Sequence, residues 1–591
     1  MTLPDSFVAS RPFRRFMARA DPRYHVPSPA FFSHKARPRL HGAVRLRVLR
    51  DLRGAEGGRI HLAAHVWTRH PAVDFLSLTA HWVTYDPAGG GGRRRQAVLS
   101  VRGLPKERPP GGQLEQQELV RQTRSWLAPN SLSLGLTVAG GGCPGLERAV
   151  REAGHAHVPC FAHCLGLLVG GFLHHHHSVQ LAVGTARAAV AHLRRSPEAQ
   201  QLLARLRRES GLPAAGRPWP EETGRWDATY RLLEWLAERQ LPLRECAAQH
   251  RLGEAGAKLT PGLWSLVGSL VALLQPFEMA AREVEAAGAS LSQVLPQVRY
   301  LHIFLRQIRG RFEAARGGEA RAAGRLAESL ALQLATDHRL NELFHHEAYV
   351  LATLLDPRFK GKMEAILPLG SDVDHWKQVL VRKVKEIMVA SACPAPPRAP
   401  QSPPGFRDFP AERPPRGRKG SRGPEKGGGK GAAPLPLIHK EKTLTEHLEG
   451  VGLLASEGKG ASLSTESHSA CVMVDKYLHD TQTVGARDDP LDYWERRRGL
   501  WPALAHLATL YLSCPPSGAS SEHLFGSLDG LAEGRGSPLE VEAAEDLLFL
   551  KTNLENFPDY SPPPLIFSSD SDPGSVRDPG EEEQQPASDT P

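Results

Sequence analysis

Residues 489–554 read DPLDYWERRRGLWPALAHLATLYLSCPPSGASSEHLFGSLDGLAEGRGSPLEVEAAEDLLFLKTNL, and this stretch decides the fold. Apolar residues recur at helical spacing in residues 500–512 and again in residues 541–554, so we expect two helices with apolar faces. Two helices rich in Leu and Ala, if exposed as one patch, would form an association site. The alternative is that both helices belong to the core of a single chain, and the pattern leaves both interpretations open.

A β-rich pattern occupies the chain from residue 59 onward. We expect strands in residues 59–67, 72–85, 94–103 and 131–138, and helices in residues 113–127 and 144–154. Short turns join the first three strands, which predicts an antiparallel meander. The order of three antiparallel strands, a helix, a strand and a helix is typical of RNase-H-like α/β domains.

The remaining segments differ in composition. Helical spacing dominates from about residue 160 to 390, whereas the next fifty residues are rich in Pro, Gly and charge and should be disordered. Three prolines interrupt any long helix in the basic N-terminal segment. We therefore expect an N-terminal basic segment (1–57), the first part of the α/β core (58–159), a helical insertion (160–390), a disordered linker (391–440), a C-terminal region that completes the core (441–557) and a disordered acidic tail (558–591).

Composition bounds the class of protein. The chain has 591 residues, 41% of them hydrophobic, which suits two or three domains. Its formal charge of +9 permits contact with nucleic acid without requiring it. Seven scattered cysteines favour reduced thiols of the cytosol or nucleus over a disulfide framework or a paired zinc site. We find no signal peptide and no stretch of about 18 uncharged apolar residues, so we expect no membrane span.

The C-terminal stretch resembles the dimerisation region of the hAT superfamily of transposases. Its elements stand in the superfamily's order: Asp-Pro-Leu and a Trp, Pro-x-Leu with an alanine-rich helix, Ser-Glu-x-x-Phe, and Leu-Leu-Phe-Leu-Lys-x-Asn-Leu. The resemblance implies an RNase-H-like core interrupted by a large all-α insertion and followed by a dimerisation region. It assigns dimerisation to Trp494, Leu504, Leu507, Leu512, Phe525, Leu547, Leu548, Leu550 and Leu554.

Two further blocks carry the same resemblance. Residues 224–236, GRWDATYRLLEWL, are similar to the superfamily's Arg-Trp-Asn-Ser-Thr-Tyr helix through Arg225 and Trp226. Residues 158–169, VPCFAHCLGLLV, are similar to its Cys-x-x-His-x-Leu element through Cys160 and His163. Residues 11–28 resemble the segment after the zinc finger of vertebrate BED-finger relatives. Residues 1–58 hold no Cys, so we expect no such finger in this chain.

The catalytic carboxylates of the superfamily are largely missing. By the resemblance, two Asp and one Glu hold two divalent metals, which require hard anionic oxygen ligands. We place His65 at the first Asp and Ala139 at the second, while Glu522 retains the Glu. We therefore expect no transposase activity, no resident metal and no other cofactor.

Each motif residue also has a structural interpretation. His65 is more simply a packed histidine than a metal ligand, and Cys160 with His163 is more simply a packing pair than a zinc site. Trp226 is either a DNA-end contact, as the resemblance implies, or a core residue. The run His174–His177 favours a solvated helix surface, and GGGCPG at residues 140–145 lacks the rest of a phosphate-binding motif.

The favoured function is that of a non-catalytic, transposase-derived nuclear protein. We expect it to form a homodimer and to associate with DNA or chromatin, with a role in regulating transcription; a cytoplasmic pool is compatible with this. The rival hypothesis is a protein-interaction scaffold that pairs with BED-finger relatives and does not bind DNA. Neither hypothesis includes a membrane or a small-molecule substrate.

Overall fold

The computed structural model describes residues 5–68, 73–85, 91–107, 112–141, 144–209, 211, 225–315, 317–392, 447–448, 470–482, 484–518 and 541–556. The linker predicted at 391–440 and the tail predicted at 558–591 lie outside these residues, apart from residues 391–392 at the end of one helix.

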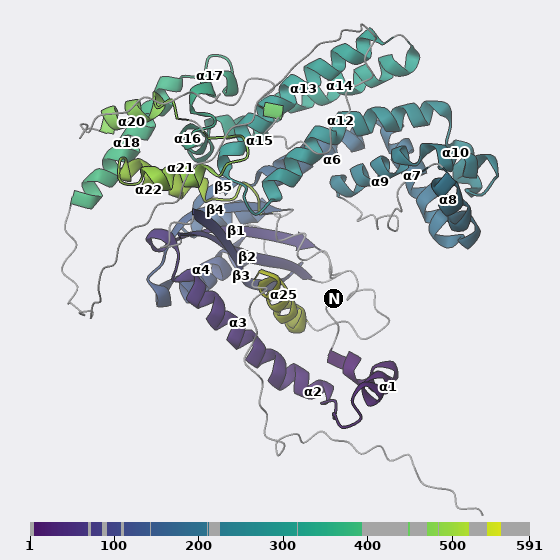
Figure 1. Cartoon of the computed structure of the whole chain (residues 1–591), viewed down its shortest axis with the longest axis horizontal. Coiled ribbons are helices and arrows are strands. Elements are labelled where there is room, and N and C mark those ends of the chain that lie inside the picture. The colour runs from purple at the N-terminus through teal and green to yellow at the C-terminus, as the bar shows by residue number, and fades with distance from the viewer. Residues whose placement is uncertain are drawn as a thin grey trace, which may run out of the picture.

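Five strands form one mixed sheet (Figure 1). They are β1 (Arg59–Thr68), β2 (Val73–Tyr85), β3 (Gly92–Pro105), β4 (Ser133–Gly141) and β5 (Ala156–Pro159). Their spatial order is β3-β2-β1-β4-β5, in which β1 to β3 are antiparallel and β1, β4 and β5 are parallel. The predicted antiparallel meander is therefore confirmed, whereas the four-residue β5 was not predicted.

One face of the sheet forms a core with helices from both ends of the chain. The core includes Ile60, Leu62, Ala64 and Val66 of β1, together with apolar side chains of α3 (Arg37–Leu52), α4 (Gln113–Leu127), α5 (Pro144–Glu152) and α25 (Val541–Asn556). Asn553 of α25 binds the edge strand through both atoms of its amide. It accepts from Val98 N–H at 3.0 Å and donates to Val98 C=O at 2.9 Å.

The N-terminal segment is more helical than the sequence predicts. It holds α1 (Arg11–Ala20), α2 (Pro29–Phe31) and the sixteen-residue α3. Pro38 was expected to interrupt a helix here, and this expectation is wrong. A π-helical segment, Phe32–Ala36, leads without a break into α3, so Pro38 lies within a continuous helical run that tolerates it.

The other face of the sheet meets a large helical region (Figure 1). Its helices are α6 (Phe161–His175), α7 (His177–Arg195), α8 (Pro197–Glu209), α9 (Trp226–Glu238), α10 (Gln240–Ala248), α11 (Gly253–Lys258), α12 (Pro261–Glu285), α13 (Val294–Ala314), α14 (Gly318–Thr336), α15 (His338–Glu342), α16 (Glu347–Leu355), α17 (Met363–Ile366) and α18 (Val373–Ala392). Every element that the structure describes between residues 161 and 392 is a helix, as the spacing predicts.

Helix α12 is longer and more apolar than we expect from the sequence, which predicts no membrane span. By length and composition alone it could cross a membrane, but 61% of its most apolar window is buried within the protein. Residues 259–277 carry no charged side chain, although Thr, Ser and Gln interrupt the apolar run. Its burial against neighbouring helices is what a core helix requires.

The C-terminal block packs against the helical region before α25 returns to the sheet. It consists of α20 (Ala470–Leu478), α21 (Pro490–Arg497) and α22 (Pro502–Leu512). Tyr477, Tyr493, Trp494 and Trp501 form one aromatic cluster. Lys360 links the helical region to the C-terminal block, because its ammonium donates to the carbonyls of Tyr477 at 2.7 Å and Asp480 at 2.8 Å.

Candidate functional site between the sheet and the helical region

A cleft of about 580 Å³ lies where β1 meets α6, α9 and α12. Its volume is within the range of ligand-binding clefts. Five residues singled out in the sequence line it together: His65, Cys160, His163, Arg225 and Trp226. The fold therefore brings together three motifs that lie far apart in the chain.

Ala139 is adjacent to this cleft but faces away from it. In the parallel pairing of β1 with β4, Ala64 lies opposite Ala139 and His65 lies opposite Gly140. Ala139 is buried in the core on the other face of the sheet, together with Ala64. A carboxylate at position 139 would point away from His65, so the cleft-side position of β4 is Gly140.

Gly140 leaves no room for a side chain. A Cβ atom there would lie 2.5 Å from Cys160 Cβ and 3.3 Å from His163 Cβ. Both Cys160 and His163 would have to shift to admit even a methyl group.

Charges in the cleft are balanced. Its lining carries three arginines (Arg225, Arg231 and Arg282) and three acids (Asp227, Glu278 and Glu285). The guanidinium of Arg225 donates two hydrogen bonds of 3.0 Å to Asp227, and Arg231 reaches the same carboxylate at 3.5 Å. Arg282 lies 3.7 Å from Glu278, whose pKa is raised mainly by burial. The cleft thus offers neither a net cation nor a net anion.

The described residues do not form a metal site. Within the described ranges, no group of three His, Cys, Asp or Glu side chains is placed to hold a metal ion. The two-metal chemistry implied by the resemblance requires several carboxylates at one point. The three acids of the described cleft lining form no such group, and Asp227 and Glu278 are paired with arginines. Glu522 and Phe525 lie outside the described residues.

Cys160 connects the cleft to the C-terminal block. Its sulfur accepts from Gly518 N–H at 3.4 Å and lies 3.7 Å from Ser517 Oγ, while its own N–H donates to Ala139 C=O. A Cβ atom on Gly518 would lie 3.7 Å from Ala63 Cβ. Gly518, the last described residue before Glu522, therefore lies beside β1. These contacts give Cys160 a packing role.

Trp226 lies at the start of α9, partly buried against the large helical core. Its indole lies close to Gly166 of α6: a Cβ atom at position 166 would lie 3.4 Å from Trp226 Nε1.

His65 stacks on Trp67 with ring centroids 6.4 Å apart. Sequence reasoning did not identify Asp227 as the acid that holds Arg225; their spacing of two residues was the available signal.

The residues assigned to dimerisation are largely buried within the single chain. Trp494, Leu504, Leu507 and Leu512 belong to the core of the helical region, and Leu548 and Leu550 to the core beneath the sheet. Leu547 and Leu554 are half-buried. Which side chains would contact a second chain stays a prediction.

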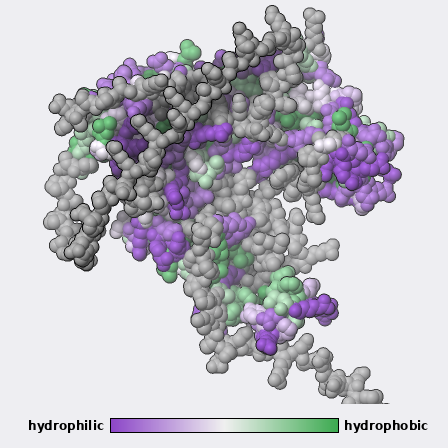
Figure 2. Space-filling model, in the orientation of Figure 1, coloured by the Kyte–Doolittle hydropathy of each residue, from purple (hydrophilic) through white to green (hydrophobic). Residues whose placement is uncertain are grey.

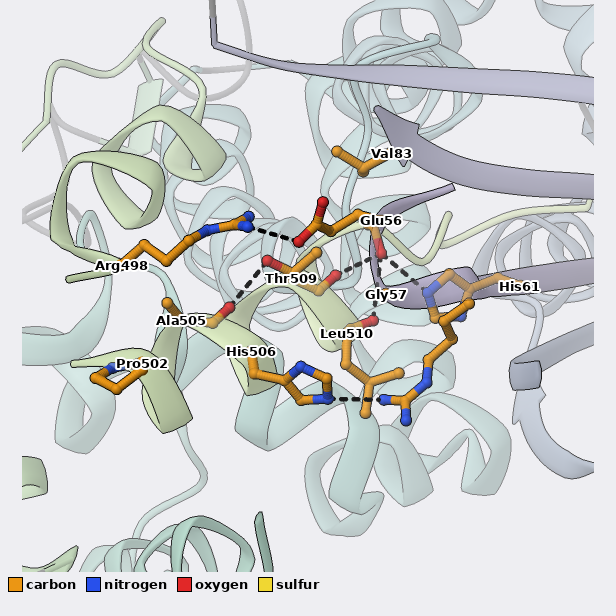
Figure 3. Close-up of a pocket in the computed structure, with 12 residues that line it drawn as sticks. Glu56, Gly57, His61, Val83, Arg498, Pro502, Ala505, His506, Thr509 and Leu510 are labelled. Atoms are coloured by element: carbon orange, nitrogen blue, oxygen red, sulfur yellow. Dashed lines mark hydrogen bonds and ion pairs between the residues drawn. The ribbon is translucent and has the colours of Figure 1, made fainter. Parts of the chain in front are cut away.

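The outer face of α22 lines a second cavity of about 220 Å³ (Figure 3). Pro502, His506 and Thr509 of α22 face residues at the start of β1. Two contacts cross the cavity: Arg498 pairs with Glu56 at 2.6 Å, and Arg59 Nη1 lies 3.3 Å from His506 Nε2. Within the described residues, this is the side of α22 that the core does not cover.

Two neutral histidines lie on neighbouring strands of the sheet, and one of them, His61, lines this second cavity. His61 and His81 face each other across β1 and β2, and burial lowers their pKa values to about 3 and about 4. His61 Nδ1 accepts from Leu136 N–H at 3.0 Å, so Nε2 must carry the proton and donate to Ser513 Oγ at 2.9 Å.

Known proteins match this chain in two ways. Residues 473–554 match the family described as the hAT family C-terminal dimerisation region. Along most of its length, the chain is 31% identical over 581 residues to mouse "Zinc finger BED domain-containing protein 6" and 32% identical over 598 residues to the human protein of that name. These matches cover 96% and 99% of this chain, but 55% and 57% of the relatives. The chain therefore spans about half the length of these relatives.

A third match covers nearly the whole of a shorter relative. The chain is 54% identical over 227 residues to human ZBED10P, covering 95% of that protein and 38% of this chain.

Proposed function

The chain belongs to the ZBED family of hAT-derived proteins, and on that premise we propose that it is a non-catalytic nuclear protein that forms a homodimer and associates with DNA or chromatin. The match of residues 473–554 to the hAT dimerisation region carries the proposal. Regulation of transcription is the role that such a protein would serve.

We further propose that the α/β part is an RNase-H-like core. The strand order β3-β2-β1-β4-β5, with an antiparallel meander and two parallel strands, supports this assignment. The helical insertion separates the sheet from the C-terminal block, which packs back against both. This is the arrangement that the resemblance implies.

Loss of catalysis is part of the proposal. A histidine, His65, takes the place of the first acid, and Gly140 has no space for a second acid on the cleft side of β4. A single retained glutamate, Glu522, cannot hold two divalent ions. A cleft lined by balanced ion pairs is consistent with a site that no longer gathers metals.

Molar mass in solution, measured by light scattering on the intact chain, tests the dimer. One chain has a mass of 64.5 kDa, so we expect twice this value, about 129 kDa, at micromolar concentration. A mass of one chain across the micromolar range would refute the homodimer and favour the scaffold that pairs with BED-finger relatives.

A substitution on the exposed side of the C-terminal block would locate the interface. Leu500 is 49% exposed beside α22, whereas the predicted interface leucines are buried or half-buried. Leu500→Asp should lower the mass to that of one chain without unfolding the protein, and Leu369→Asp, at a 98% exposed site outside the matched region, is the control. A dimer that survives Leu500→Asp would show that the interface does not include this site.

A further inference from the structure

The arginines of α1 differ from those of the cleft in having no acidic partner among the described residues. Cleft arginines are held by carboxylates, whereas the structure pairs none of Arg11, Arg14, Arg15 and Arg19 with an acid among the described residues. No residue of α1 is buried. Figure 1 shows α1 apart from the sheet and from the helical region, and Figure 2 shows hydrophilic and hydrophobic residues together in that part of the surface.

The sequence of α1 separates its charges from its apolar side chains. Arg11, Arg15 and Arg19 recur every four residues and share one face of the helix, with Arg14 beside them. Phe13, Phe16, Met17 and Ala20 occupy the opposite face. The ring of Phe13 packs against Phe7, which precedes the helix, with centroids 5.1 Å apart.

This arrangement disfavours an isolated helix. Like charges four residues apart on a helix repel one another, and α1 contains no acid to offset them. A polyanion removes the repulsion. At a rise of about 1.5 Å per residue, the three arginines lie about 6 Å apart along the axis, and duplex DNA presents one phosphate charge per about 1.7 Å of its length.

We propose that the arginine face of α1 binds the phosphate backbone of duplex DNA without reading its sequence. The proposal rests on the DNA association of the proposed function and assigns it a surface. Guanidinium groups form strong charge-assisted hydrogen bonds to phosphate oxygens. Contacts to phosphates fix position on the duplex and carry no direct sequence information.

An anionic membrane surface is the competing partner for a cationic helix with an apolar back. Duplex DNA is favoured for two reasons. Phe7 already packs against Phe13 of the apolar face, and four of the ten residues are arginines while three are large apolar side chains. The exposed Arg93 and Arg95 of β3 add cationic surface on a second element.

The test measures binding of the full chain to a fluorescent DNA duplex of about 20 base pairs over a series of salt concentrations. In the variant R11Q/R15Q/R19Q we expect affinity to fall by at least about tenfold at 0.1 M salt. We also expect the slope of log affinity against log salt to fall by about one for each arginine. The loss should be equal for two duplexes of unrelated sequence.

A matched variant controls for net charge. R321Q/R325Q/R382Q removes three exposed arginines from α14 and α18 that likewise have no acidic partner among the described residues, and should leave affinity within about twofold. R11K/R15K/R19K keeps the charges and should retain most of the salt slope.

Three outcomes overturn the proposal. Equal effects of the α1 and control variants would refute the role of α1 while leaving DNA association intact. No salt-dependent binding by the intact chain would refute DNA association together with this surface. Arginine-dependent binding to phosphatidylserine vesicles, without binding to the duplex, would identify a membrane surface as the partner instead.

Discussion

Acidification should weaken the sheet because His61 and His81 are buried without charge. Burial is the largest cause of both lowered pKa values, about 3 for His61 and about 4 for His81, and the neighbouring Arg59 lowers that of His61 further. Both values lie below the 6.5 of an unfolded histidine, so the unfolded chain binds more protons as pH falls. The contribution to stability is complete above about pH 6.5 and is lost as pH falls towards 4 and 3.

The magnitude follows from these values. At pH 5, an unfolded histidine with a pKa of 6.5 is mostly protonated, whereas one held near 3 or 4 is mostly neutral. Linkage then gives a loss of about 2 kcal/mol for each residue relative to pH 8, or about 4 kcal/mol for the pair. Since domains are stable by about 5–15 kcal/mol, the effect should be large.

Urea unfolding, followed by tryptophan fluorescence between pH 8 and pH 5, measures this loss. The probes include Trp67 and Trp82, which lie on the same strands as the two histidines. His81→Leu should reduce the measured loss by about 2 kcal/mol, since other buried histidines with lowered pKa values, such as His157 and His302, contribute equally in both proteins. His81 suits this change because its Nε2 is buried without a hydrogen-bond partner among the described residues.

His345→Leu, at an exposed site, serves as the control and should leave the pH dependence unchanged. If His81→Leu lost as much stability between pH 8 and pH 5 as the parent chain, His81 would not be held neutral and the reasoning would fail.

Three further changes test the rest of the structure. Lys360→Met should destabilise the chain by about 2–4 kcal/mol in urea unfolding, because two buried carbonyls lose their donor; a loss no larger than that of exposed Lys385→Met would contradict this role. Gly140→Ala should lower the free energy of unfolding by about 1–3 kcal/mol, since the new methyl group meets Cys160; an unchanged free energy would show that the cleft has room for a side chain. The intact chain should not cleave DNA with Mg²⁺ or Mn²⁺, and cleavage that disappears in Glu522→Gln would refute the loss of catalysis.

Local pattern was sufficient to predict most elements of the sheet. Residues 72–85 are rich in β-forming side chains, and β2 occupies Val73–Tyr85. The four residues of β5 were missed because a strand so short has no periodicity of its own. Its position depends on pairing with β4, which is a tertiary property.

The cleft could be predicted only in part. The resemblance identified residues such as His65 and Trp226, but their meeting in one cleft depends on the packing of α6, α9 and α12. The assignment of Ala139 shows what sequence cannot provide. Adjacent strand residues point to opposite faces, so a difference of one residue decides whether a side chain faces His65 or the opposite core.

The C-terminal block shows why an apolar stripe cannot by itself identify an interface. Helical periodicity predicts that one face of α22 avoids water, but burial within one chain and burial between two chains have the same pattern. In this chain Leu504, Leu507 and Leu512 satisfy the pattern within the core. Deleting the block would therefore open that core, and a resulting monomer would not distinguish a lost interface from an unfolded chain. Substitution at exposed Leu500 makes that distinction, because it adds charge where the core is already complete.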